Sequence, residues 1–122
     1  MQDNTRKNDI KNRSYIFSIN IVKLIDIISK NGLSSEVIAK QLIRSATSIG
    51  ANIIEAQAGS SKKDFINFIS HALKSANETV FWLGILIDSG KTAGQDVSLL
   101  KKEAIELANI LGSSIITLRG KR

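Results

Sequence analysis

The stretch 41–59, QLIRSATSIGANIIEAQAG, constrains the fold more than any other part of the chain, because it has the pattern of one helix with two different faces. At about 100° per residue, one stripe is wholly apolar and matches a core face. It holds Ile38, Leu42, Ala46, Ile49, Ile53 and Ala56. The neighbouring stripe holds Arg44, Ser48, Asn52 and Glu55, a set that is too polar and too small for a core and that lacks the Lys/Glu richness of a solvated face. This second stripe predicts a contact between helices.

Length and composition limit the classes of protein that fit. A chain of 122 residues corresponds to one domain that can bury a core without crosslinks. It has no cysteine, which excludes disulfides, zinc–thiolate sites and thiol nucleophiles. The N-terminal segment is polar, and no apolar run reaches the ~18 residues of a membrane span. We therefore expect a soluble, cytoplasmic protein.

Glycines divide the chain into four segments, and there is no proline. We expect helices over about 14–31, from a Ser34 or Ser35 cap to Gly59, over 61–90 and over 97–118. In the third, Ser61 with Asp64 three residues later resembles a capping box. Short connections predict an all-α, antiparallel up-down-up-down four-helix bundle over residues 14–118. Residues 1–13 and 119–122 are expected to be flexible basic tails.

Two of the expected helices carry more apolar residues than one buried face requires. Between Tyr15 and Ile28, ten of fourteen residues are apolar, against the ~3/7 of a helix with one buried face. Phe17, Leu24 and Ile28 lie on one side of this helix, and Tyr15, Ile19 and Val22 lie on the other.

The third helix also shows two stripes. Its expected core stripe holds Phe65, Ile69, Ala72, Leu73, Ala76, Val80, Leu83 and Ile87, and a second stripe holds Phe68, Ser75, Glu78, Trp82 and Leu86. Because extended apolar patches usually mark interfaces, we predict a cyclic homo-oligomer with Phe68, Trp82 and Leu86 at the subunit interface. The alternative is a monomer with scattered exposed apolar residues.

Several of these residues also carry a family resemblance. SIGANIIEA at 48–56, SSKKDF at 60–65 and then Phe68, Ala72, Ser75 and Glu78 resemble the four-helix-bundle proteins of the 23S rRNA intervening-sequence family. The similarity spans about residues 42–86. One position departs from it: that family typically has proline where this chain has Gly50, a change expected to affect helix bending more than the fold.

The resemblance implies antiparallel four-helix bundles that assemble into barrel-like homopentamers around a central channel. Some such proteins are encoded in insertions within large-subunit rRNA genes. A related group serves as accessory variability proteins of diversity-generating retroelements, which contact a reverse transcriptase and nucleic acid. The resemblance thus implies an architecture and two kinds of partner.

Catalytic and metal-binding motifs are not convincing in this sequence. His71 is the only histidine, whereas bundle di-iron sites need two Glu-x-x-His pairs, so Glu103 and Glu106 cannot complete one. Ser60 and Lys63 match the S-x-x-K pattern literally, but a helix cap explains the serine better. Phosphate-binding glycine loops are absent. We predict no enzyme activity, no metal and no cofactor. We interpret Arg44, Asn52, Glu55, Ser75 and Glu78 as a structural polar network.

Basic residues gather toward the two ends of the chain, and the formal net charge is +6. In an up-down-up-down bundle, the start of the first helix, the second connection and the end of the fourth helix lie at one end. We call the cluster predicted there the basic rim: Arg6, Lys7, Lys11, Arg13, Lys62, Lys63, Arg119, Lys121 and Arg122. Repeated around a ring, it matches the electrostatic footprint of a protein that contacts phosphates. The alternative is that these charges serve only solubility.

Two function classes remain open. The first is a homo-oligomer that binds RNA, or a complex containing RNA, by contacting the phosphate backbone of the RNA without reading its sequence. The second is an oligomeric scaffold that docks a protein partner such as a reverse transcriptase. Steep salt dependence of binding to naked nucleic acid would distinguish the first from the second.

Overall fold

The computed structural model contains four helices: α1 (Gln2–Ile28), α2 (Leu33–Gln57), α3 (Lys62–Asp88) and α4 (Ser98–Gly120). It describes the backbone of residues 2–120 and the side chains of residues 10–120. No strand occurs within the described backbone. The expected all-α fold with four helices is therefore confirmed.

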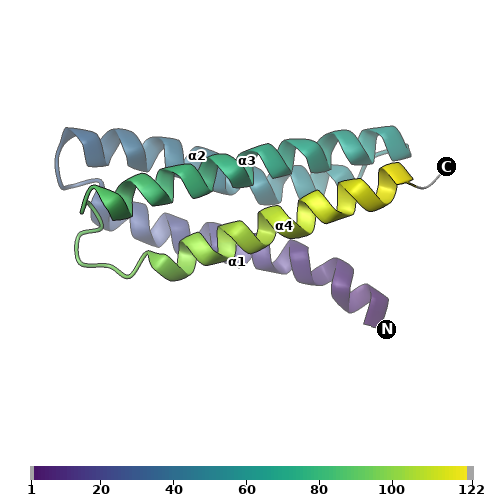
Figure 1. Cartoon of the computed structure of the whole chain (residues 1–122), viewed down its shortest axis with the longest axis horizontal. Helices are drawn as coiled ribbons and strands as arrows, with labels where there is room; N and C mark the ends of the chain where they lie inside the picture. Colours follow the sequence, from purple (N-terminus) through teal and green to yellow (C-terminus); the bar gives the residue numbers. More distant parts are fainter. Residues whose placement is uncertain (1, 121–122) are drawn as a thin grey trace.

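The four helices lie side by side along the long axis of the molecule, and the chain reverses direction at each connection (Figure 1). The start of α1, the α2–α3 turn and the end of α4 lie at the right of this view. The α1–α2 and α3–α4 connections lie at the left. Segments far apart in the sequence thus share one end of the molecule.

Two helix ends differ from expectation, one near each terminus of the chain. α1 begins at Gln2, so residues 2–13 continue this helix and do not form a separate tail. Residues 1–13 contain no glycine or proline, and nothing in this segment therefore breaks the helix. At the other terminus α4 continues to Gly120, past the expected limit.

The caps of α2 and α3 illustrate one wrong and one correct prediction. Gly32 precedes α2 with φ of 114°, a conformation that favours glycine, and no side chain caps this helix. The predicted Ser34 or Ser35 cap is wrong: Ser35 lies buried inside the helix. At α3 the prediction is confirmed, because the Ser61 hydroxyl accepts a hydrogen bond from the Asp64 N–H at 3.1 Å.

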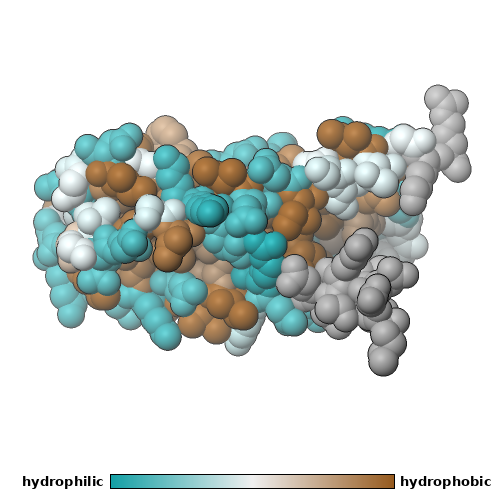
Figure 2. Space-filling model, turned by 60° about the horizontal axis from the view of Figure 1, so that its bottom comes forward, coloured by the Kyte–Doolittle hydropathy of each residue, from teal (hydrophilic) through white to brown (hydrophobic). Residues whose placement is uncertain are grey.

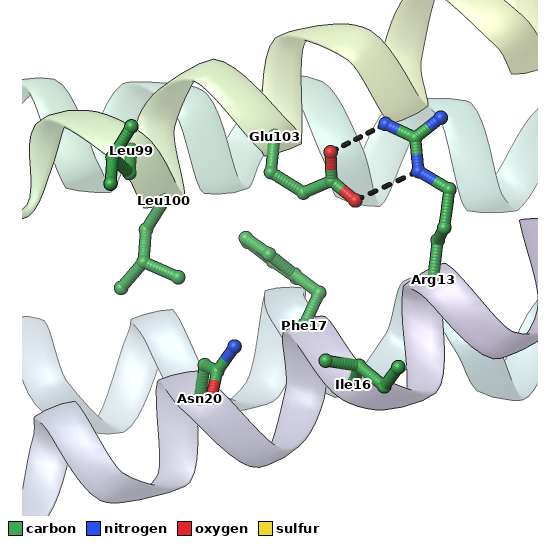
Figure 3. A pocket seen from close by; sticks show the side chains of 7 residues that line it. All are labelled: Arg13, Ile16, Phe17, Asn20, Leu99, Leu100 and Glu103. Atoms are coloured by element: carbon green, nitrogen blue, oxygen red, sulfur yellow. Dashed lines mark hydrogen bonds and ion pairs between the residues drawn. The ribbon is translucent and has the colours of Figure 1, made fainter.

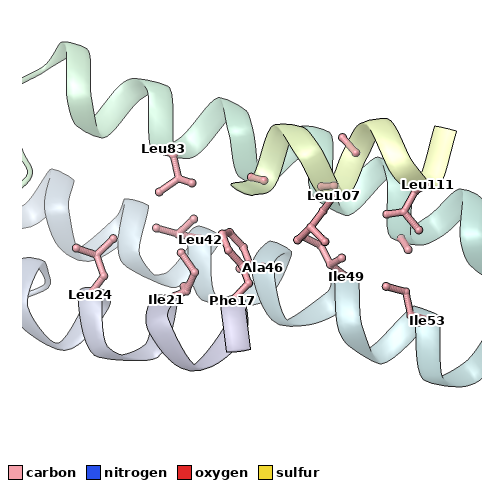
Figure 4. Packing of buried hydrophobic residues seen from close by; sticks show 14 of the residues in the cluster. Phe17, Ile21, Leu24, Leu42, Ala46, Ile49, Ile53, Leu83, Leu107 and Leu111 are labelled. Atoms are coloured by element: carbon pink, nitrogen blue, oxygen red, sulfur yellow. The ribbon is translucent and has the colours of Figure 1, made fainter. Parts of the chain in front are cut away.

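Buried residues recur at alternating steps of three and four, as in coiled coils. On α1 they are Phe17, Ile21, Leu24 and Ile28, and on α3 they are Ile69, Ala72, Ala76, Thr79, Leu83 and Leu86. Figure 4 shows several of these side chains pointing into the space between the helices. The apolar stripe predicted for α2 is buried throughout. On α3 the observed core stripe differs from the predicted one: around the helix, it lies between the predicted core stripe and the predicted second stripe.

α2 and α3 meet through small polar side chains. The Thr79 hydroxyl donates to the Ser45 Oγ at 2.9 Å, and the Ser75 hydroxyl donates to the Ser48 Oγ at 2.9 Å. Residue numbers rise along one helix as they fall along the other, so the two helices run in opposite directions. We call these four residues the α2–α3 seam.

α1 crosses α2 closely at Gly50. A Cβ added there would lie 3.2 Å from the Oγ of Ser14, which is buried. The missing side chain therefore gives α1 room to approach α2.

Candidate nucleic-acid interface

Lys62 and Lys63 are the first two residues of α3, and both are exposed. The turn before them is held by hydrogen bonds: Ser61 accepts from the Asp64 N–H, and the Ser60 hydroxyl donates to Asp64 Oδ2 at 3.1 Å. Because helix N-termini carry a partial positive charge, the backbone reinforces the charge of the two lysines. This turn is the best-defined part of the predicted basic rim.

The other residues of the basic rim are described to different extents. Arg119 is exposed in the last turn of α4. Arg6 and Lys7 lie within α1, but their side chains lie outside the described part of the structure, as do Lys121 and Arg122. The α2–α3 turn, the start of α1 and the end of α4 lie at the same end of the molecule (Figure 1).

Arg13 has a different role from the one predicted. Its Nε donates to Glu103 Oε2 at 3.0 Å, and its Nη2 lies 2.5 Å from Glu103 Oε1 and 3.7 Å from Glu106 Oε1. Two carboxylates therefore face this guanidinium, whose charge is compensated within the protein. Arg13 ties α1 to α4 and does not present an open cation to a phosphate. Sequence reasoning missed this pair because 90 positions separate Arg13 from Glu103.

The predicted polar network separates into two groups along the α2–α3 contact. In the outer group, Arg44 forms an ion pair with Glu78, and Trp82 Nε1 donates to the same carboxylate at 3.0 Å. Arg44 also donates to the side chain of Gln41 at 3.0 Å. This group is partly exposed to solvent.

The inner group joins Asn52 to the α2–α3 seam. The Asn52 amide donates to the carbonyl oxygen and the hydroxyl of Ser48, both at 2.9 Å, and Ser75 donates to the same hydroxyl. Ser45 and Thr79 extend this ladder, and the sequence prediction did not include them. Glu55 is exposed and takes part in no hydrogen bond or ion pair among the described residues.

The residues predicted at a subunit interface lie mostly inside the single chain. Leu86 is completely buried, so its assignment to an interface is wrong. Phe68 and Trp82 are half-buried against the core. The interface assignment fails because the core stripe of α3 includes Leu86. With this stripe facing the core, Trp82 lies on the side of α3 that faces α2. The neighbouring Phe81 is instead 58% exposed and lies edge-on to Trp82, with ring centroids 5.1 Å apart.

On α1, the two predicted faces are as expected. Phe17, Leu24 and Ile28 are buried, whereas Tyr15, Ile19 and Val22 are exposed in the single chain. Figure 2 brings the lower side of Figure 1 forward, and brown apolar patches lie there among hydrophilic ones. The second face of α1 is therefore available for contact with another molecule.

A hollow of about 250 Å³ lies between α1 and α4. In Figure 3 the ring of Phe17 points into it from α1, and the Arg13–Glu103 pair closes one end. Its other lining residues are Ile16, Asn20, Leu99 and Leu100. Ile16 and Leu99 are largely exposed, which leaves apolar surface at the mouth. We call this feature the α1–α4 hollow.

The described residues show few other features typical of a catalytic or metal-binding site. No group of three potential metal ligands occurs among the described side chains. His71 is exposed on α3. The pKa of the Asp96 carboxyl is lowered, mainly because the Ser98 hydroxyl donates a hydrogen bond to it. Within the described residues, no helix is both long and apolar enough to cross a membrane.

The fold and the exposed basic turn thus define an all-α four-helix protein with a polar, cation-bearing end. Residues 6–113 match the family described as 23S rRNA-intervening sequence protein. Because this match covers most of the 122 residues, the chain belongs to that family. The resemblance based on residues 42–86 is confirmed.

A crystal structure from Bacteroides thetaiotaomicron has a similar fold, with a TM-score of 0.81 and 37% sequence identity. The similarity covers 89% of this chain and 96% of that one. That protein is described as having unknown function and as belonging to the S23 ribosomal protein family. None of the curated proteins compared with the chain matches it. Neither the family description nor the description of the Bacteroides thetaiotaomicron protein names a catalytic activity.

Proposed function

We propose that this chain is a non-catalytic, homo-oligomeric bundle protein that binds RNA, or an RNA-containing complex, through the α2–α3 turn. The observation that carries the proposal is the exposed pair Lys62 and Lys63 at the start of a capped helix. The capped turn fixes the backbone from which both lysine side chains extend. Arg119 at the end of α4 adds a further exposed cation.

The chemistry of these groups favours contact with a phosphate backbone. Lysine amines and a helix N-terminus attract phosphates without reading bases. The family description refers to an intervening sequence of 23S rRNA, and the similar structure is described as an S23 ribosomal protein family member. The first name mentions ribosomal RNA and the second mentions a ribosomal protein family, and RNA is a polyanion that such a surface fits.

Assembly into a closed homo-oligomer is the second part of the proposal. Tyr15, Ile19 and Val22 form an apolar face of α1 that the single chain leaves in water. A ring of copies would cover such a face and would repeat the lysine pair around one rim. A pentamer is the number that the family resemblance implies.

Binding of a labelled single-stranded RNA and of a DNA duplex, measured over a range of salt concentrations, tests the nucleic-acid proposal. Replacing Lys62 and Lys63 together by Glu should weaken both interactions. The slope of log affinity against log salt should fall by about one unit per lost contact per subunit. Oligomer size should not change.

Lys30 and Lys91 provide the matched control pair. Both are exposed, and they lie in the connections at the opposite end of the molecule. Replacing them by Glu changes the net charge equally but should leave affinity within about twofold. Equal weakening by both pairs would reduce the effect to general basicity. If the unmodified protein showed no salt-sensitive binding, the proposal would be contradicted.

An oligomeric scaffold for a protein partner is the second candidate function. The partly exposed group formed by Arg44, Glu78 and Trp82 favours it, because aromatic and arginine residues are enriched at protein–protein hot spots. A partner such as a reverse transcriptase would then bind the oligomer at high salt, and naked RNA would not bind.

A further inference from the structure

We propose that Phe81 of one copy fills the α1–α4 hollow of the next copy, while Lys74 of the first copy pairs with Glu106 of the second. This inference rests on the homo-oligomer proposed above and names one pair of surfaces that meet in it, separate from the Tyr15, Ile19 and Val22 face of α1. The second copy is indicated because one chain carries both a hollow and a projecting side chain that can fill it, with charges of opposite sign beside them.

The hollow has the size and lining to accept an aromatic ring. An enclosed apolar cavity of roughly 150 Å³ is enough to take up benzene; this hollow measures about 250 Å³, opens to solvent and is partly lined by Arg13, Asn20 and Glu103. Phe17, Ile16 and Leu99 supply apolar surface at its floor and mouth (Figure 3). Water beside this apolar part of the lining gains few hydrogen bonds there, so an entering side chain displaces it favourably.

Phe81 projects from the outer side of α3. The buried stripe of this helix includes Ala76, Thr79 and Leu83, and Phe81 lies on the opposite side of the helical wheel. Its edge-on contact with Trp82 supports one side of the ring. A phenyl ring that is 58% exposed and positioned in this way gains from burial in a partner.

Charges beside the two features are complementary. At the hollow, the single guanidinium of Arg13 faces both Glu103 and Glu106, and the Glu106 side chain remains 54% exposed. Among these three side chains, one negative charge exceeds the positive charge. On α3, Lys74 is exposed and lies two turns from Phe81 on the same side.

The spacing of the two pairs matches. Lys74 and Phe81 are seven residues apart on α3, and Leu99 and Glu106 are seven residues apart on α4. At 1.5 Å per residue, both separations are about 10 Å along the helix axis. α3 of one copy can thus lie antiparallel to α4 of the next, with Phe81 over the hollow and Lys74 beside Glu106.

The two surfaces belong to different sides of the bundle. A contact between them is therefore heterologous: each copy offers one surface to the preceding copy and the other to the following copy. Such contacts form a ring when the rotation between copies closes. This geometry agrees with the cyclic assembly proposed above and differs from a two-fold dimer.

Native mass spectrometry and light scattering of four variants test the assignment. Phe81→Asp should raise the dissociation constant of the assembly by at least about 30-fold, the range of an interface hot spot. Lys74→Glu and Glu106→Lys should each weaken it by about 3- to 10-fold. The double variant Lys74→Glu/Glu106→Lys should recover most of this loss, because it restores opposite charges in reversed order.

Leu33→Asp and Lys40→Glu are the controls for burial and charge. Leu33 is 79% exposed in the first turn of α2, where an acidic residue suits the helix dipole. Lys40 is exposed on α2, which takes no part in the proposed contact. Neither substitution touches the proposed contact, and both variants should assemble like the unmodified protein. Circular dichroism verifies that every variant is helical.

The outcomes separate this inference from the proposed function. If the unmodified protein is a monomer, the proposed assembly fails and this contact fails with it. If it is an oligomer that Phe81→Asp leaves intact, only the choice of surfaces is overturned. If Phe81→Asp does not fold, the charge-reversal variants decide. Recovery of assembly in the double variant Lys74→Glu/Glu106→Lys supports the contact, and additive weakening of assembly in that variant contradicts it.

Discussion

Between α2 and α3, hydroxyl groups meet inside the core, whereas between α1 and α4 a hollow remains and one arginine bridges it. In the α2–α3 seam, Ser45 and Thr79 are both completely buried and share a hydrogen bond. At the α1–α4 hollow, Ile16 and Leu99 keep much of their surface in water. Both regions are contacts between neighbouring helices of one bundle.

This difference indicates a division of roles. Small side chains bring α2 and α3 close together and satisfy their own polar groups, so this contact is complete within one chain. The α1–α4 contact depends on the Arg13 ion pair and leaves apolar surface unburied. We infer that a second molecule completes the α1–α4 side.

The largest expected difference concerns added volume. Ser45→Leu places a large side chain in the close seam and removes the hydrogen bond with Thr79, so it should lower the free energy of unfolding by about 3 kcal/mol or more. Asn20→Leu adds a similar side chain to the hollow and should change stability by no more than about 0.5 kcal/mol. Urea denaturation of both variants checks this. Equal losses would contradict the contrast between the regions.

Double-mutant cycles compare the ion pairs of the two regions. Arg13 and Glu103 are mostly buried, at 27% and 28% exposure, whereas Arg44 and Glu78 are more exposed, at 57% and 36%. After allowance for solvent screening, the Arg13–Glu103 coupling should be about 1 kcal/mol and the Arg44–Glu78 coupling about 0.5 kcal/mol or less. Thermal unfolding at low and high salt measures both. A larger coupling for Arg44–Glu78 would reverse the proposed order.

Glycine replacements probe how closely the helices approach. A Cβ at Gly112 meets nothing within 4 Å, so Gly112→Ala should stabilise the protein by up to about 1 kcal/mol through helix propensity. At Gly50 the added Cβ crowds Ser14, whose hydroxyl donates to the Lys11 carbonyl. Gly50→Ala should therefore give no gain in melting temperature. An equal gain in melting temperature at both positions would show that α1 moves away from α2 easily.

The smallest effect concerns the connection that leads into α4 at the edge of the hollow. Asp96 Oδ1 accepts hydrogen bonds from the N–H and hydroxyl of Ser98, which lower the pKa of this carboxyl from its usual 3.8. A lowered folded pKa stabilises the protein above pH 3.8, and this contribution disappears as pH falls through the folded value. Asp96→Asn should slightly lower the melting temperature at neutral pH and have no effect in strong acid. A constant difference at all pH values would exclude this ionisation.

Much of the fold follows from the sequence, because the apolar periodicity and the spaced glycines are local signals. The buried stripe of α2 and the Ser61 cap of α3 were both predicted correctly. The core stripe of α3 was less clear, since apolar residues occupy most of that helix. Only packing against α2 shows that Leu86 belongs to the core.

The site was less predictable from sequence, because it depends on distant pairs. Lys62 and Lys63 could be placed by topology, and the structure shows them exposed. The pairing of Arg13 with Glu103 could not be predicted, since no local pattern links positions 90 residues apart. The hollow is likewise a product of how α1 and α4 meet and has no signature along the chain.

Light scattering coupled to size exclusion at micromolar concentration tests the central claim, that another copy of the chain completes the α1–α4 side. We predict a particle with a mass several times that of the 13.3 kDa chain, with five copies as the expected number. The number of protein copies should not depend on whether RNA is present. A particle of 13.3 kDa under these conditions would contradict the claim.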